Sequence, residues 1–353
     1  MMRAPHKLPG LVLEKLLSGW SRRRDLSKIQ LILPRIPLQQ GAPHPALWEV
    51  QRIEWPKWSR TGVTVALVGP EGGPPRVALK LAHTETGIES LRRQYSILQL
   101  LQMDPRLNAI RPLLPRPLAE GVVQAQFYTV EEALPGRSGE YLMFEPQAFV
   151  HLQRAATIIR QLHEATTASV RVDAPRLERW VSAPARIVRR AAIRLPRPTY
   201  YTAATRQLED ELHGALAGRL VDTNWIHGDF WLGNLLVRDC GEIVGIVDWE
   251  RSMSDELALH DLMHLLLFTR KQVHKWGEAD IIAAMSRSIK WSPEERALLE
   301  DAQAAMPCVP VDERTAALLY WLRHTAATLA LLPEYASNRD YLTDNIEAVL
   351  SRI

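Results

Sequence analysis

The chain has 353 residues, of which 46% are hydrophobic and 24% are charged, a composition typical of a folded globular protein and unlike that of a disordered or fibrous chain. The formal net charge of +3 is too small to indicate nucleic-acid binding by itself, and the sequence has neither an aromatic-interleaved basic run nor zinc-finger spacing. We therefore expect a two-lobed globular protein with no nucleic-acid partner.

The sequence also gives no sign of export or of a membrane span. Cys240 and Cys308 lie far apart without CxxC spacing, which predicts incidental thiols in a reducing compartment. The N-terminus lacks a long apolar core and a small-residue cleavage site, so we expect no signal peptide. The most apolar long segment, 315–332, holds Arg323 and His324 at its middle and predicts a buried core helix. We expect a cytoplasmic location.

The predicted elements change character along the chain. Residues 46–81 contain LWEVQRIEW, TGVTVALVG and RVALKLA, whose β-branched residues and Gly/Pro punctuation predict a small antiparallel sheet. Apolar residues recur at helical spacing over 86–102 and predict a helix packed on that sheet. After a proline-rich connector at 111–121, VVQAQFYTVEEALPG predicts two short strands that run into a hinge. From 146 onward the pattern is mostly helical.

These patterns predict an α+β fold with two lobes. We expect an N-terminal extension at 1–45, a small lobe of antiparallel sheet plus helix at 46–133, and a larger, mostly helical lobe at 134–353.

One stretch of the larger lobe, HGDFWLGNLLV at 227–237, places three polar side chains just before an apolar strand. The strand candidates LLV and IVGIVD flank the turn cluster RDCGE and predict a β-hairpin. Asn234 and Asp248 lie seven residues on either side of Gly241. With roughly symmetric pairing, both emerge side by side at the open end of the hairpin, and Asp229 lies on the loop just upstream.

Such a cluster of hard oxygen ligands suits Mg²⁺, which binds a few carboxylate or amide oxygens together with waters and phosphates. Zinc would need more histidine or cysteine than this loop offers. Asp229 is then available to orient and deprotonate a hydroxyl nucleophile. The alternative is that the three side chains only cap turns and end a strand.

The motif HGDxxxxN at 227–234, followed by IVDWE at 246–250, resembles the catalytic and metal-binding signature of the aminoglycoside phosphotransferase and choline kinase superfamily, which shares the protein-kinase-like fold. The resemblance extends to Leu162-His163, to VEEALPG at 130–136 and to Asp261-Leu262. It spans roughly residues 46–270 and implies phosphoryl transfer from ATP.

The resemblance implies a role for each residue of the signature. Asp229 is the expected catalytic base, Asn234 and Asp248 are the expected Mg²⁺ ligands, and His227 is a structural member of the catalytic loop. Asp261 resembles the family's supporting aspartate, which steadies that loop; the alternative is an ordinary acid at a helix N-terminus.

In the small lobe, Lys80 of RVALKLA resembles the kinase lysine that contacts the α and β phosphates. The glutamate that usually pairs with this lysine has no clear counterpart: the expected position on the helix is Gln94, and the nearby acid is Glu89. Either Glu89 takes the role from an earlier turn or Gln94 makes a weaker neutral contact.

Two other nucleotide contacts are expected. PKWSRTG at 56–62 is no GxGxxG loop, but Ser59 and Thr61 have hydroxyl groups for the phosphates. The hinge would pair its backbone with adenine through Glu131, Glu132 and Ala133.

The acceptor is less constrained. Residues 171–200 carry eight arginines against two acids, which favours an anionic or neutral acceptor if this face lines the acceptor site. The same segment has apolar residues near helical spacing, so peripheral contact with an anionic membrane and a solvated basic face are alternatives. The expected function is Mg-ATP-dependent transfer of the γ-phosphate to a hydroxyl of a small molecule such as a sugar, an amino alcohol or an aminoglycoside-like acceptor, with GTP as an alternative donor. The alternative function is a nucleotide-binding pseudokinase that regulates a protein partner.

Overall fold

The computed structural model describes residues 25–36, 48–54, 62–275, 277, 291–304, 306–308 and 311–353. Ser59 and Thr61, the expected hydroxyl donors to phosphate, lie outside these ranges. The chain divides into two compact units. The first comprises the described residues up to Gln99 together with Pro115–Leu134, and the second comprises Leu100–Leu114 and the described residues from Pro135 onward.

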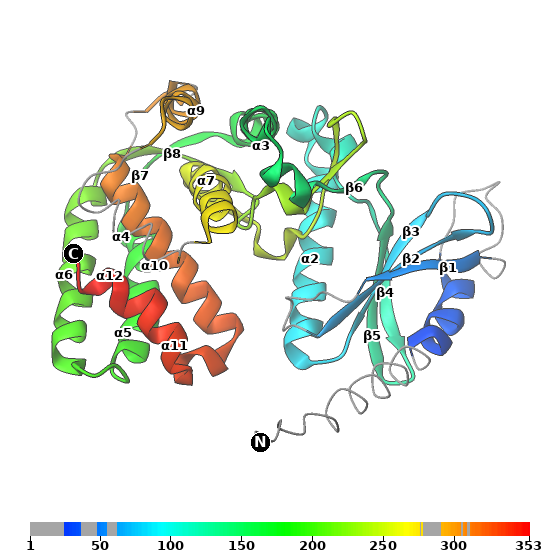
Figure 1. Ribbon diagram of the computed structural model, residues 1–353, viewed down its shortest axis with the longest axis horizontal. Coiled ribbons are helices and arrows are strands. Elements are labelled where there is room, and N and C mark those ends of the chain that lie inside the picture. The colour runs from blue at the N-terminus through cyan, green and yellow to red at the C-terminus, as the bar shows by residue number, and fades with distance from the viewer. Residues whose placement is uncertain are drawn as a thin grey trace, which may run out of the picture. The chain divides into compact units, whose positions relative to one another are not determined.

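The first unit is built on one antiparallel sheet of five strands in the order β1-β2-β3-β5-β4 (Figure 1). The strands are β1 (Trp48–Glu54), β2 (Val63–Pro70), β3 (Val77–Ala82), β4 (Pro117–Val123) and β5 (Gln126–Glu132). The helix α2 (Glu85–Met103) packs Ile88 and Leu91 on the face formed by Val63, Ala82 and Phe127. This arrangement matches the predicted sheet plus helix.

One strand begins earlier than the sequence indicated. β4 starts at Pro117, inside the stretch expected to be a proline-rich connector. A proline lacks the N–H that a central strand needs, but β4 is an edge strand and begins with it, which is where proline is tolerated.

A short helical segment covers the other face of the sheet. Residues 25–32 are helical and continue into a 3-10 turn, Leu33–Arg35. Ile29 and Ile32, both 0% exposed, pack against Leu79, Leu81 and Val130 of the sheet. The expectation that 1–45 is an extension is therefore wrong for residues 25–36, which complete the core of the first unit because the sheet has two apolar faces to bury.

The second unit is mostly helical and carries two small sheets (Figure 1). In the part of this unit that the structure describes, the α-helices are α3 (Ala148–Thr166), α4 (Ala174–Leu177), α5 (Ala183–Ala192), α6 (Pro198–Leu216), α7 (Leu259–His274), α9 (Pro293–Ala304), α10 (Glu313–Leu331), α11 (Arg339–Leu342) and α12 (Ala348–Leu350). One sheet has the order β10-β9-β6, from β6 (Arg137–Ser138), β9 (Leu235–Val237) and β10 (Ile243–Ile246). The other has the order β11-β8-β7, from β7 (Ala168–Arg171), β8 (Leu220–Ile226) and β11 (Met253–Glu256).

The apolar segment expected to form a core helix is α10. It packs against α5 and α7 and is buried along most of its length. Arg323 at its middle is 8% exposed and forms an ion pair with Glu256, 2.5 Å away, which explains how a charge is accommodated there. Among the described residues, no helix is long and apolar enough to cross a membrane.

Candidate active site

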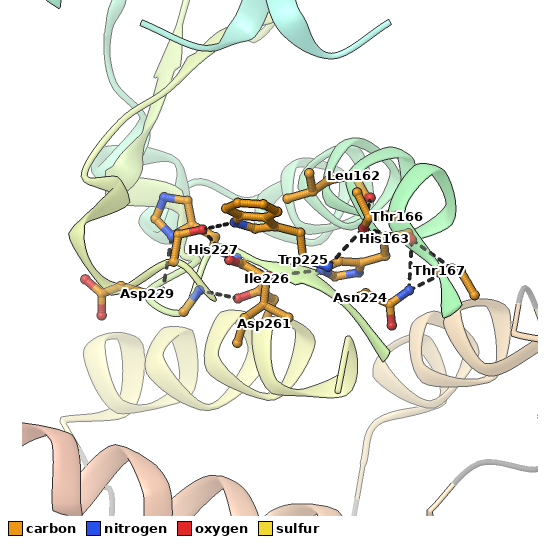
Figure 2. Close-up of polar contacts among 12 residues, drawn as sticks. Leu162, His163, Thr166, Thr167, Asn224, Trp225, Ile226, His227, Asp229 and Asp261 are labelled. Atoms are coloured by element: carbon orange, nitrogen blue, oxygen red, sulfur yellow. Dashed lines mark hydrogen bonds and ion pairs between the residues drawn. The ribbon is translucent and has the colours of Figure 1, made fainter. Parts of the chain in front are cut away.

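The loop after β8 is held in place by a buried aspartate. Asp261, in the first turn of α7, is 0% exposed and accepts hydrogen bonds from the backbone N–H groups of His227 and Gly228, each at 2.8 Å. His163 of α3 lies 3.0 Å from the same carboxylate (Figure 2). Burial opposes ionisation of Asp261, but the His163 and His227 contacts lower its pKa below the usual value. One carboxylate thus joins two helices to the loop.

The ring of His227 is fully buried beneath the same loop. Its Nε2 lies 2.9 Å from the carbonyl oxygen of Val247, and its Nδ1 lies 3.3 Å from the backbone nitrogen of Asp229. Because Nδ1 accepts from that N–H, Nε2 carries the proton and donates to Val247. The indole of Trp249 packs on the ring at a centroid distance of 4.6 Å. His227 therefore supports the loop and does not reach outward toward a reactant.

The glycine of the motif is required by a close backbone approach. Gly228 has φ +82°, and a Cβ at this position would lie 2.3 Å from the carbonyl oxygen of Arg251. Both the left-handed conformation and this contact exclude a larger residue. The sequence HGD therefore has a steric reason for its middle residue.

Asp229 follows Gly228 on the loop that Asp261 and His227 support. Its side chain is 29% exposed, with Oδ1 3.3 Å from Nε2 of His264 and 3.9 Å from the guanidinium of Arg251. The Nε2 of His264 lies within ion-pair distance of Oδ1 of Asp229, but the two atoms do not have the alignment of a hydrogen bond. Burial works to raise the pKa of Asp229, but His264, Arg251 and His324 more than offset it and hold that pKa well below its usual range.

The sequence analysis did not single out His264, although its spacing from Asp261 could have indicated it. It lies three residues after Asp261 on α7, so the two side chains point from the same face of the helix. Its ring is 1% exposed, and its Nδ1 is 2.8 Å from the hydroxyl of Tyr320 on α10. A proton donated by Tyr320 to Nδ1 leaves an N–H at Nε2 facing Asp229.

The predicted hairpin carries Asn234 and Asp248, but its register differs by one residue from the prediction. A bulge between Ile243 and Gly245 shifts the pairing, so Ile246 lies opposite Leu235. The N–H of Val247 donates to the carbonyl of Asn234 at 2.9 Å. Asp248 is therefore one residue beyond the position opposite Asn234, an offset of one residue from symmetric pairing.

Asp248 turns out of the strand at this point. It has φ 64° and ψ 58°, the left-handed conformation, and its side chain is exposed. Such a conformation costs about 1–3 kcal/mol for a non-glycine residue and concentrates at functional sites, although aspartate tolerates it better than most residues. This turn changes the direction of the Asp248 carboxylate immediately after Val247, the residue that pairs with Asn234.

The donor set around this turn fits a hard divalent cation. The amide nitrogen of Asn234 donates to the carbonyl oxygen of Asp229 at 2.8 Å. This bond fixes which end of the amide faces the loop, so its oxygen points elsewhere. An amide oxygen and an exposed carboxylate provide the oxygen ligands that Mg²⁺ binds together with phosphates and waters.

In the first unit, Lys80 lies in a buried polar group. Its Nζ is 2.7 Å from Oε1 of Glu131, and the amide of Gln94 donates to Oε2 of Glu131 at 2.9 Å. Glu89 is exposed on α2. The expectation that Glu89 or Gln94 partners the lysine is corrected: the facing carboxylate comes from β5, and Gln94 contacts that carboxylate.

The same strand limits the expected backbone pairing with adenine. The N–H of Glu132 already donates to the carbonyl of Arg116 at 2.8 Å, and the N–H of Ala133 donates to the carbonyl of Arg76 at 3.0 Å. These two donors are used inside the sheet. A base at Glu131–Ala133 would have to use carbonyl groups or the following residue.

Half of the arginines in the arginine-rich segment form ion pairs within the chain. Four of its eight arginines face carboxylates: Arg176 with Asp173 and Asp255, Arg179 with Asp255 and Glu256, Arg186 with Glu178, and Arg189 with Glu209. These pairs reduce the positive excess on which the expectation of an anionic or neutral acceptor was based. Trp180, Val181 and Val188 are each 0% exposed, so the apolar side chains that a membrane would have to bind lie in the core.

The comparisons with known proteins agree with this geometry. The family described as "Phosphotransferase enzyme family" matches residues 59–299, which is more than half of the chain. The chain belongs to this phosphotransferase enzyme family. Its membership confirms the resemblance drawn from HGDxxxxN and IVDWE and confirms that the protein is an enzyme of the small-molecule kinase class.

Solved structures show the fold of this phosphotransferase. It is similar to the ADP-bound aminoglycoside phosphotransferase APH(2'')-Ib, with 10% identity over 86% of this chain and 93% of that chain and a TM-score of 0.50. It is also similar to APH(3'')-Id from Streptomyces rimosus in complex with ADP and streptomycin, with 15% identity, 75% and 93% coverage and a TM-score of 0.46. A third similar structure is a glucosamine kinase in complex with glucosamine, ADP and inorganic phosphate, with 17% identity, 87% and 83% coverage and a TM-score of 0.45. The predicted α+β, kinase-like fold class is confirmed. No curated protein matches the chain.

Proposed function

We propose that this phosphotransferase moves the γ-phosphate of Mg-ATP to a hydroxyl group of a small ring-containing molecule, with Asp229 as the catalytic base. The observation that carries the proposal is the environment of Asp229. Its carboxylate is partly exposed, lies on a loop fixed by Asp261, and has its pKa held well below the usual range.

A carboxylate with a low pKa is a weak base. Phosphoryl transfer does not need a strong base. The transition state is loose, so most of the rate comes from positioning and from neutralising charge. Asp229 would accept a hydrogen bond from the acceptor hydroxyl, orient the hydroxyl oxygen toward the γ-phosphorus, and take the hydroxyl proton as the new O–P bond forms and the bond from the γ-phosphorus to the departing ADP breaks. His264 and Arg251 keep the carboxylate ionised for this task.

Other residues hold the donor. Asn234 and Asp248 would bind Mg²⁺ through their side-chain oxygens, and Lys80 would contact phosphate oxygens through its ammonium group. When bound, Mg-ATP would supply the phosphoryl group, and its Mg²⁺ would offset negative charge on the phosphate oxygens. ADP in similar structures supports a nucleotide donor, and GTP stays an alternative to ATP.

An aromatic surface next to Asp229 bears on the acceptor. Trp231 is half-buried, two residues after the base, and packs on Phe268 at a centroid distance of 4.6 Å. Phe268 stacks on His264 in turn, at 5.3 Å. Aromatic faces next to a hydrogen-bond acceptor suit a ring with apolar and hydroxyl groups. A sugar or a sugar-bearing molecule therefore fits better than a linear amino alcohol.

The test is Mg²⁺-dependent consumption of ATP and of GTP by the wild type and by the Asp229→Asn variant, against a panel of sugars, aminoglycosides and amino alcohols. We expect turnover that depends on a ring-containing acceptor and falls about 10²- to 10⁴-fold in the variant, the usual contribution of a general base. Nucleotide binding should change little, because Asp229 does not hold the donor.

Two controls separate the alternatives. Asp210→Asn changes an exposed aspartate of α6 and should leave turnover unchanged. Equal turnover by wild type and Asp229→Asn would refute the mechanism. Nucleotide binding without turnover on any acceptor would instead favour a pseudokinase that acts on a protein partner.

A further inference from the structure

A cavity of about 90 Å³ lies inside the second unit, next to the residues that hold the loop of Asp229. Of the described residues that line it, none belongs to the proposed transfer site. The cavity lies between α3, β8, α7 and α10, and its lining is mostly apolar, with side chains from Ala156, Ile159, Val221, Leu259, Leu262 and Leu319. It is therefore separate from the place where a phosphoryl acceptor would meet Asp229.

Two histidines flank Asp261 and line this cavity. His163 is 4% exposed, and its Nε2 lies 3.0 Å from Oδ2 of Asp261. The neutral ring therefore has its proton on Nε2 and a lone pair on Nδ1, and no side chain or backbone group in the described ranges forms a hydrogen bond to that Nδ1. The wall of the cavity thus includes a buried acceptor that lacks a donor.

His260 supplies a second polar group. It packs against the ring of Tyr320 at a centroid distance of 5.2 Å, and within the described part of the chain neither of its nitrogens has a hydrogen-bond partner. Burial lowers the pKa of His260 well below its usual value, and the charge of Arg323 lowers it further. A neutral imidazole has one donor and one acceptor to give to an occupant.

The size and charge of the cavity limit what fits. An engineered protein cavity of about 150 Å³ binds benzene, so this one has room for roughly four or five non-hydrogen atoms. About three waters would also fill the volume, but each needs two to four polar partners, and the lining is mostly apolar. The charged side chains of the lining already have partners, Arg323 with Glu256, Arg160 with Glu164 and Asp222 with Ser169. An ion would lose its hydration there without a free countercharge.

We infer that this cavity is a binding site for a small neutral molecule with an apolar body and a hydroxyl or ring N–H group, held by His163 and His260. The polar group donates to Nδ1 of His163, and an adjacent oxygen or nitrogen accepts from His260. The site goes beyond the proposed transfer reaction, because its occupant needs neither nucleotide nor phosphoryl acceptor.

Pyrazole is a suitable probe, because it is a neutral five-membered ring with one donor and one acceptor side by side. Thiophene has the same ring size without a donor. The readout is the methyl NMR signal of Met306, which lines the cavity and is assigned with the Met306→Leu variant. We expect pyrazole to shift this signal saturably in the full-length protein with a Kd of about 1 mM, and thiophene to bind about 10-fold or more weakly.

Two variants locate the binding. Ala156→Leu places a larger side chain in the cavity and should abolish the shift, whereas Ala148→Leu changes a half-buried alanine on the same helix, away from the lining, and should bind pyrazole as the wild type does. His260→Leu keeps an apolar wall but removes the imidazole. It should weaken binding about 10-fold, as expected for the loss of one neutral hydrogen bond.

Each opposite result overturns the inference. The absence of a saturable Met306 shift would mean that the cavity holds water or stays empty. Equal binding of thiophene and pyrazole would show that the histidines do not recognise the occupant, as would undiminished binding by His260→Leu. Undiminished binding by Ala156→Leu would place the probe elsewhere. Because no nucleotide or acceptor is added, these results do not depend on whether the proposed transfer reaction occurs.

Discussion

The carboxylate of Asp261 accepts a hydrogen bond of 2.8 Å from the backbone N–H of His227, at the start of the loop that carries Asp229. Replacing Asp261 with Asn puts an amide NH₂ group next to the backbone N–H donors of His227 and Gly228. It also removes the negative charge that faces His163. We expect the free energy of unfolding to fall by about 3 kcal/mol, since buried donors lose their acceptor. Turnover should fall as well, because the loop that presents Asp229 is no longer fixed.

Chemical denaturation measures the first effect and the acceptor-dependent assay measures the second. The exposed Asp210→Asn variant on α6 serves as the control for an Asp-to-Asn change. A variant as stable as the wild type would show that the hydrogen bonds of Asp261 do not hold the loop in place.

The sequence was sufficient to bring Asp229 and Asn234 together because their contacts are encoded locally. HGDxxxxN places Asp229 on the loop and Asn234 at the end of the 3-10 turn before β9, and the amide of Asn234 donates to the carbonyl of Asp229. The hairpin position was predicted within one residue. The bulge between Ile243 and Gly245 was not, because a single extra residue in a strand leaves no mark in an alternating apolar pattern.

Long-range partners were harder to predict. The carboxylate facing Lys80 depends on strand register and on the rotamer of Glu131, neither of which is visible in the helix motif. The helical segment at 25–36 could have been found, because Ile29, Ile32, Leu33 and Ile36 recur at helical spacing. It was read as an extension because it precedes the first recognisable strand.

His264 should matter for turnover and not for nucleotide binding, because it contacts Asp229. His264→Phe removes the N–H that faces the base, whereas His264→Gln can keep an amide donor near the position of Nε2. We expect kcat to fall about 10- to 100-fold in the Phe variant, with partial recovery in the Gln variant and little change in KM for the nucleotide. Equal kcat values for wild type and Phe variant would rule out this role.

Tyr320→Phe provides a milder version of the same test. It removes the hydroxyl 2.8 Å from Nδ1 of His264 and leaves the imidazole in place. A smaller loss of kcat is expected, since the ring keeps its contact with Asp229 but loses the group that selects its tautomer.

Stability should decrease as the pH falls below neutrality because of the buried His227. Burial lowers the pKa of His227, an effect that the carboxylates of Asp261, Asp229 and Asp248 only partly oppose. The folded state therefore binds fewer protons than the unfolded state below about pH 6.5, and the free energy of unfolding falls as pH drops through that range. Each such histidine contributes a slope of at most about 1.4 kcal/mol per pH unit.

Denaturation at pH 7.5 and at pH 5.5, at equal ionic strength, measures this decrease. His227→Asn should be less stable at pH 7.5 and should show a shallower pH dependence. His274→Asn, at an exposed position near the end of α7, should keep the wild-type slope. A slope of the same size in His227→Asn would assign the effect to other groups.

Asp248 allows metal binding and backbone conformation to be tested separately. Its φ of 64° is tolerated by asparagine nearly as well as by aspartate, whereas alanine is strained there. We expect Asp248→Asn to match the wild type in stability within about 0.5 kcal/mol, and Asp248→Ala to lose about 1 kcal/mol. Both variants lose the carboxylate, so both should need more Mg²⁺ for nucleotide turnover.

The Mg²⁺ dependence should therefore be the same in the two variants even though their stabilities differ. A titration of turnover against free Mg²⁺ at fixed ATP measures the first quantity, and denaturation measures the second. Asn234→Ala should shift the Mg²⁺ dependence in the same direction, because it removes the other proposed oxygen ligand. If Asp248→Asn responded to Mg²⁺ as the wild type does, the carboxylate would not be a ligand, and its left-handed turn would have only a structural purpose.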